Sequence, residues 1–73
     1  MKTLKDLTTG QSGTISRVGC HGALKQRFMD MGITKGTEVK IIKIAPLGDP
    51  IEIEIRGYNL SIRKADAENI LIG

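Results

Sequence analysis

Isoleucine alternates with charged residues from Ile51 to Arg56, and this alternation constrains the fold more than any other feature of the sequence. A period of two places the isoleucines on one face of a β-strand and the charged side chains on the other. Such a strand is buried on one face and wet on the other. Gly57 interrupts the pattern, and Leu60 and Ile62 resume it. The segment therefore predicts two antiparallel strands with a shared apolar face.

The register of this hairpin depends on which residues form its turn. A two-residue loop at Gly57-Tyr58, with glycine at its first central position, would match the turns that hairpins favour. Ile55 would then pair with Leu60, and Ile53 would pair with Ile62. All four side chains would lie on the buried face.

Three further strands are expected, at 14–18, 38–44 and 70–72. The second of these changes phase, because Glu38 to Ile41 alternates in one sense and Ile42 to Ile44 in the other. A phase change of this kind predicts a bulge or a sharp bend. Small barrels need such a bend where the sheet curls over to close.

Helical spacing appears between the first two of the five strands. Leu24, Phe28 and Met31 fall at i, i+4 and i+7, which predicts a short amphipathic helix from Ala23 to Met31. Gly32 follows as a left-handed C-cap, and Ile33 comes next to pack back on the last turn.

Two single helical turns complete the expected elements. At the start of the chain, Thr3 can cap a turn in which Leu4 and Leu7 share a face and cover one end of the core. Residues 65–68 suggest a second turn before the last strand. The expected fold is thus all-β, a five-stranded barrel with a helix between strands 1 and 2 and a helical turn before strand 5.

Length and composition agree with one domain over residues 1–73. The chain has 73 residues, of which 40% are hydrophobic, and a chain this short can hold only one modest core. Its isoleucines are β-branched and suit a pleated sheet. The single cysteine, Cys20, cannot form an intramolecular disulfide, and no apolar leader opens the chain, so a reducing cytoplasmic setting is expected. The longest apolar run, Ile70 to Ile72, is far shorter than the roughly 20 residues that span a bilayer, so no membrane insertion is expected.

Three segments resemble the signature stretches of a known family. Residues 29–37 (MDMGITKGT) and 45–53 (APLGDPIEI) resemble two of those of the FeoA family, and residues 56–64 (RGYNLSIRK) resemble the third. The resemblance extends from about Leu4 to Ile72. It implies an SH3-like barrel in the cytoplasm that assists FeoB, a ferrous iron permease with a cytoplasmic GTPase domain. Whether such a domain activates, inhibits or tethers the permease stays open, as does its state as a monomer or homo-oligomer.

The link to iron draws attention to Cys20 and His21, which place a thiol and an imidazole side by side in a glycine-rich loop. Closed metal sites use four ligands with characteristic spacings, and the sequence has no second cysteine or histidine. We expect both to be ordinary loop residues and no cofactor to be required. A transition metal held by these two alone would be bound weakly.

Catalysis is not expected of this chain. The carboxylates Glu52 and Glu54 alternate along a strand and suit a solvated face, and the single histidine has no nucleophile motif beyond its neighbouring cysteine. No GxxxxGK[ST] sequence is present to cradle a phosphate, so the domain should not bind GTP itself. It could instead supply an arginine to a partner's GTPase, and four are available, although a solvated arginine is the commoner case: Arg17, Arg27, Arg56 and Arg63.

Nucleic-acid binding is the alternative function, because the formal charge is +3 and the pI is near 9.3. The lysines and arginines are nevertheless scattered among glutamates, and the two aromatic residues are assigned to the core and to a turn. Single-strand binders use exposed aromatic platforms along a continuous basic groove. A stand-alone relative of the C-terminal domain of a metal-dependent repressor is a further alternative, but no helix-turn-helix module precedes this sequence.

Protein binding is the function that the sequence favours, with two candidate surfaces. The first is the loop 45–50, where Leu47, Gly48 and Asp49 lie between two prolines. Leu47 is either a plug over the barrel end or an exposed anchor for a partner, with the plug slightly favoured because a single exposed leucine needs no functional explanation. The second surface is the helix, where Met29 lies off the apolar stripe and Arg27 stands at its edge.

Overall fold

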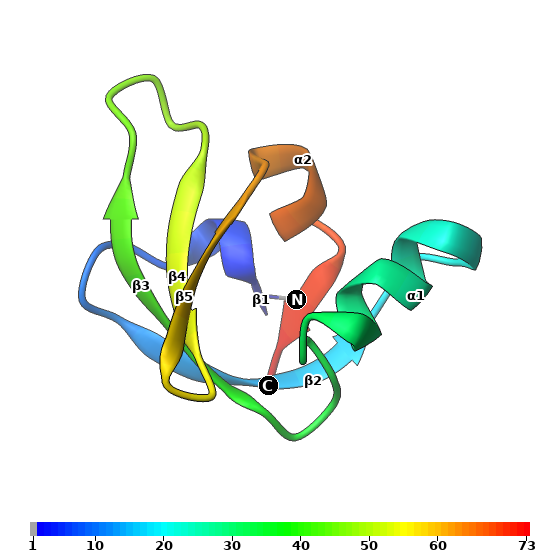
Figure 1. Cartoon of the computed structure of the whole chain (residues 1–73). Coiled ribbons are helices and arrows are strands. Elements are labelled where there is room, and N and C mark those ends of the chain that lie inside the picture. Colours follow the sequence, from blue (N-terminus) through cyan, green and yellow to red (C-terminus); the bar gives the residue numbers. More distant parts are fainter. Residues whose placement is uncertain (1) are drawn as a thin grey trace.

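The computed structural model describes residues 2–73, which form one curled sheet of six antiparallel strands with three short helices (Figure 1). The strands are β1 (Lys2–Thr3), β2 (Ser12–Val18), β3 (Glu38–Ile44), β4 (Ile51–Ile55), β5 (Tyr58–Ile62) and β6 (Ile70–Ile72). The helices are the 3-10 turn η1 (Leu4–Asp6), α1 (Gly22–Asp30) and α2 (Lys64–Ala67). Strand order in the sheet is β1-β6-β2-β3-β4-β5. The expected all-β class, the helix after the first long strand and the turn before the last strand are confirmed.

The sixth strand, β1, was not expected from the sequence. It pairs Lys2 with Ile72 and Thr3 with Leu71, so it adds two residues to the edge of β6. Two residues are too few to show a period of two. Its partner strand also lies at the opposite end of the sequence, where no local pattern can indicate the pairing.

Two bends curl the sheet. In β3 the register to β4 shifts between Ile41 and Lys43, which confirms the expected change of face near Ile42. In β2 the register to β6 shifts between Ile15 and Arg17. The first residues of β2 pair with β3, whereas the residues from Ile15 onward pair with β6. A bulge bends a strand and increases its twist, so these two positions allow one sheet to wrap around its own apolar face.

The interior is filled by side chains from every part of the chain. Ile51, Ile53 and Ile55 of β4 are all buried, as the alternation predicts, and Phe28 of α1 is 1% exposed. The two other members of the predicted helix face, Leu24 and Met31, are partly buried against this core. The remaining buried side chains are Leu4, Leu7, Ile15, Cys20, Ile33, Val39, Ile41, Ile62, Ala67 and Ile70.

The register predicted for the β4–β5 hairpin is wrong by two residues. The turn is Arg56-Gly57, with φ angles of 51° and 84°, so Ile55 pairs with Tyr58 and Ile53 with Leu60. Two positive φ angles are the signature of the type I′ turn, whose twist suits a hairpin. A left-handed arginine is uncommon, which is why the sequence favoured a turn one residue later. Because the shift is an even number of residues, the predicted buried face is unchanged.

The C-terminal end of α1 is capped as the sequence predicts. Gly32 has a φ of 88° and its N–H donates to the carbonyl of Met29 at 3.0 Å. The N–H of Ile33 donates to the carbonyl of Phe28 at 2.8 Å, which completes a Schellman motif. Ile33 is fully buried, so the cap also fixes the path of the chain into the turn before β3.

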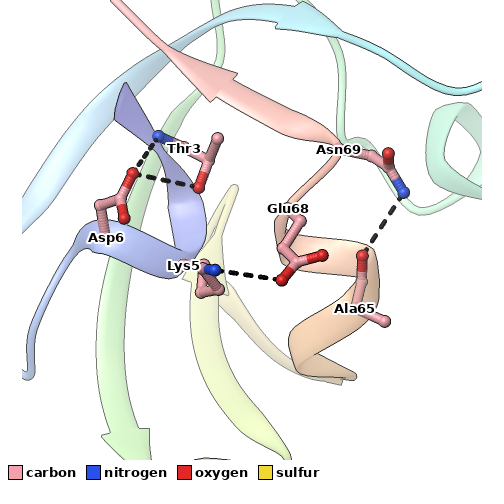
Figure 2. Close-up of polar contacts among 6 residues, drawn as sticks. All are labelled: Thr3, Lys5, Asp6, Ala65, Glu68 and Asn69. Carbon is pink, nitrogen blue, oxygen red and sulfur yellow. Dashed lines mark hydrogen bonds and ion pairs between the residues drawn. The ribbon is translucent and has the colours of Figure 1, made fainter. Parts of the chain in front are cut away.

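At the opposite side of the barrel, η1 and α2 lie side by side (Figure 2). The Asp6 carboxylate accepts the Thr3 backbone N–H at 2.9 Å and the Thr3 hydroxyl at 3.3 Å, and the Lys5 ammonium lies 3.1 Å from the Glu68 carboxylate. Leu4 is buried beneath this turn. The predicted helical turn starting at Thr3 is therefore confirmed, and it covers one end of the core.

Replacing Asp6 by asparagine should change the pH dependence of stability. The Thr3 backbone N–H lowers the pKa of the Asp6 carboxyl below its ordinary value. A depressed folded-state pKa stabilises the fold above the unfolded pKa, about 3.9, and this contribution is lost as the pH falls through the folded value. The difference in unfolding free energy between the wild type and Asp6→Asn, measured by urea at a series of pH values, should therefore shrink below about pH 4. A difference that stays constant down to about pH 2 would contradict this role for Asp6.

Replacing Gly32 by alanine should destabilise the domain more than replacing Gly36. Both glycines have a φ near 90°, so both substitutions carry left-handed strain of about 1 kcal/mol. A Cβ at Gly36 would meet nothing within 4 Å, whereas at Gly32 it would lie 3.2 Å from Arg56 Cδ and 3.3 Å from the Tyr58 hydroxyl. We expect Gly32→Ala to cost about 2 kcal/mol or more in thermal or urea unfolding. Equal losses for the two variants would show that Arg56 and Tyr58 move aside freely.

Candidate protein-binding surfaces

The loop between β3 and β4 is fixed by three hydrogen bonds at its base. The N–H of Ala45 donates to the carbonyl of Pro50 at 3.1 Å, and the N–H of Gly48 donates to the carbonyl of Ala45 at 2.7 Å. The Asp49 carboxylate accepts the backbone N–H of Lys64, at the start of α2, at 3.1 Å. The loop is thus a closed turn that is tied to α2, and it projects beyond the sheet at one end of the barrel (Figure 1).

Leu47 stands at the tip of this loop and is 94% exposed. This exposure excludes the interpretation of Leu47 as a plug over the barrel end, which the sequence analysis slightly favoured. The reason is the turn itself, because Pro46 and Gly48 direct the loop outward and Asp49 holds it there. Leu47 is consequently a solvated apolar side chain on a rigid support, the state expected of an anchor.

The helix α1 presents the second predicted surface. Met29 is 50% exposed, in agreement with its position off the buried stripe, and Arg27 is exposed. In Figure 1, α1 lies on the opposite side of the view from the β3–β4 loop, with β5 and α2 between them. The structure therefore keeps Leu47 apart from Met29 and Arg27, and they form two separate surfaces.

Two side chains of the β4–β5 hairpin form hydrogen bonds with the end of α1 and with the turn that follows it. The Tyr58 hydroxyl donates a hydrogen bond to the carbonyl of Met31, and an Arg56 Nη donates to the Thr37 hydroxyl at 3.2 Å. Thr37 also shares a hydrogen bond of 3.0 Å with Thr34. All four candidate arginines are exposed, and of these Arg56 donates a hydrogen bond to another side chain of the fold.

The two potential metal ligands lie in different surroundings. Cys20 is 8% exposed and belongs to the core cluster, whereas His21 is exposed at the N-cap of α1. Within residues 2–73, no group of three or more histidine, cysteine or acidic side chains is placed to hold a metal ion.

A hollow of about 550 Å³ on the outer face of the sheet was not anticipated from the sequence. Its lining combines the cations Lys40 and Arg56 with the carboxylates Glu38 and Glu54. These residues come from β3, β4 and the following turn, and only the curl of the sheet makes the surface concave. Ser12 and Thr37 add hydroxyl groups to this lining, so the hollow is a polar surface of mixed charge. In the described part of the chain, no helix is long and apolar enough to cross a bilayer.

Comparison with known proteins gives a family for the chain. The FeoA domain family matches residues 2–73. Over 67 residues, 92% of this chain, the sequence is 37% identical to a fusion of Fe(2+) transport protein A with the Fe(2+) transporter FeoB from Porphyromonas gingivalis. The match covers 8% of that fusion protein, so the chain corresponds to a small part of its length.

Solved structures share the fold. Iron(II) transport protein A from Clostridium thermocellum is 35% identical, with a TM-score of 0.94 over 97% of this chain and 44% of that one. FeoA of Stenotrophomonas maltophilia, determined as a zinc complex and described as a prokaryotic SH3 domain protein, is 23% identical, with a TM-score of 0.86 over 100% of this chain and 91% of that one. At that level of identity the likeness shows the fold alone. The family match over nearly the whole chain and the SH3-like barrel together show that this protein belongs to the FeoA family, which takes part in ferrous iron transport.

Proposed function

We propose that this domain is an accessory protein of ferrous iron uptake that binds a FeoB-type permease at its cytoplasmic face and modulates it. The observation that carries the proposal is the fusion of a homologous domain to FeoB in Porphyromonas gingivalis. Covalent linkage keeps two modules at a high effective concentration, which favours modules that act on one another.

The loop tip is the surface that suits this role. Leu47 is exposed before any partner arrives, and the hydrogen bonds at Ala45, Gly48 and Asp49 already order its backbone. A preorganised anchor loses little conformational entropy when it docks, so its buried area contributes more fully to affinity. Its apolar surface would favour a partner pocket of matching shape and low polarity.

Replacing Leu47 by aspartate should weaken binding while sparing the fold. Because the side chain is solvated, the melting temperature of Leu47→Asp should stay close to that of the wild type. Capture of the permease from detergent-solubilised membranes of the native cell should fall at least about tenfold, or about 1.4 kcal/mol. The measurement is quantitative pull-down with the tagged domain, with and without nucleotide.

Two controls separate binding from folding and from charge. Ile53 is fully buried at the centre of β4, so Ile53→Asp should unfold the domain. Thr9 lies in the exposed turn before β2, outside the β3–β4 loop. Thr9→Asp adds the same negative charge there and should leave capture of the permease unchanged. Equal capture by Leu47→Asp and the wild type would remove the loop from the binding surface. Recovery of RNA instead of the permease by the intact domain would overturn the proposal in favour of nucleic-acid binding.

A further inference from the structure

The two edges of the sheet are built differently. The strand order places β1 at one edge and β5 at the other. β1 is two residues long, and very short edge strands are one way in which proteins prevent unwanted pairing. β5 is five residues long, from Tyr58 to Ile62, and pairs with β4 at every position without a register shift. Only the β5 edge offers a strand of ordinary length.

The register of the hairpin determines which backbone groups of β5 face outward. Ile55 and Tyr58 flank the two-residue turn, so they form a hydrogen-bonded pair, and hydrogen-bonded pairs alternate along an antiparallel ladder. The N–H and C=O groups of Tyr58, Leu60 and Ile62 therefore point toward β4, and those of Asn59 and Ser61 point to the open edge. Within residues 2–73, no backbone hydrogen bond from another segment reaches Asn59 or Ser61. Both residues are exposed.

The edge also lacks the usual protective devices. Natural sheets shield exposed edges with a charged residue, a proline, a bulge or a covering element. The sequence Tyr-Asn-Leu-Ser-Ile of β5 contains no charge and no proline, and its pairing with β4 contains no bulge. Leu60 is half-buried on the core face and Tyr58 is 44% exposed, so an added strand would meet apolar surface there.

We propose that the open edge of β5 binds an extended, acidic-ended segment of a partner protein by strand addition. The inference rests on the proposed function, in which the domain acts by binding a protein, and it identifies the kind of segment that is bound. Residues 56–64 carry three cations, Arg56, Arg63 and Lys64, and no carboxylate. Carboxylates at the two ends of the segment would complement these charges, and alternating apolar residues would cover Leu60.

A second copy of this chain fits the same edge poorly. A symmetric antiparallel pair centred on Leu60 would align Asn59 of one copy with Ser61 of the other, which satisfies the backbone. It would also bring the Arg56 turn of each copy toward Lys64, at the start of α2, of the other, and the approach of like charges disfavours association. Glu52 and Glu54 of β4 lie beside Ser61 and Asn59, so the cations that favour an acidic partner over self-association are those at the two ends of β5.

The test is amide hydrogen exchange of the full chain, measured by NMR, with a synthetic peptide as the probe. The peptide has about nine residues, with valine and threonine alternating between pairs of aspartates. At saturating peptide, exchange of the Asn59 and Ser61 amides should slow by at least about tenfold, whereas a peptide with proline at its centre should have no effect. Unchanged exchange at both amides would overturn the inference. So would protection that rises with protein concentration without peptide, because the occupant would then be a second copy.

Substitutions at Ser61 separate the backbone from the side chain. Proline is tolerated on an edge strand where the N–H faces solvent, so Ser61→Pro should stay folded and lose at least about tenfold in peptide affinity. The matched control Ser61→Ala keeps the N–H and should bind as the wild type does. If Ser61→Pro fails to fold, Arg63→Glu leaves the backbone intact and should weaken binding of the acidic peptide by a similar factor. Equal losses for Ser61→Ala and Ser61→Pro, or no loss for Arg63→Glu, would overturn the inference. Since the permease takes no part in this experiment, its outcome is independent of the capture assay with Leu47→Asp.

Discussion

The bends in β2 and β3 determine the shape on which the rest of this domain depends. A flat sheet of six short strands would leave its isoleucine face open to water, because the chain is too short to supply a second layer. The register shifts near Ser16 and Ile42 curl the sheet until that face closes on itself. Phe28 from α1 then fills the interior from one side, and Leu4 from η1 fills it from another.

Features that depend on local pattern could be predicted from the sequence, and features that depend on a single backbone conformation could not. Alternation at Ile51 to Ile55 identified β4, and the phase change at Ile42 identified its bent neighbour β3. The turn of the β4–β5 hairpin was misplaced, because Arg56 adopts a left-handed φ that its residue type rarely takes. The strand at Lys2–Thr3 was missed because its pairing with β6 joins the two ends of the sequence.

The candidate binding residues show the same difference between what local pattern predicts and what a long-range contact determines. The sequence identified the loop around Leu47 but could not decide whether the leucine is buried. That outcome depends on Asp49, whose carboxylate bonds the backbone of Lys64, 15 positions along the chain. A contact between a loop and the start of a distant helix produces no periodic pattern in the sequence from which it could be predicted. Exposure at Met29, in contrast, followed directly from helical spacing, because α1 alone determines which of its faces is buried.

Both surfaces proposed for binding are held in place by hydrogen bonds that involve main-chain groups. The base of the Leu47 loop is closed by backbone groups of Ala45, Gly48 and Pro50, and the β5 edge is aligned by its ladder to β4. Side chains at Leu47, Asn59 and Ser61 are exposed and contribute little to the core. Substitutions there can therefore change which partner is recognised without a loss of stability that a domain with one small core could not absorb. The isoleucines on the buried face of β4 and β5 have no such freedom, since each fills part of the core cluster of residues 2–73.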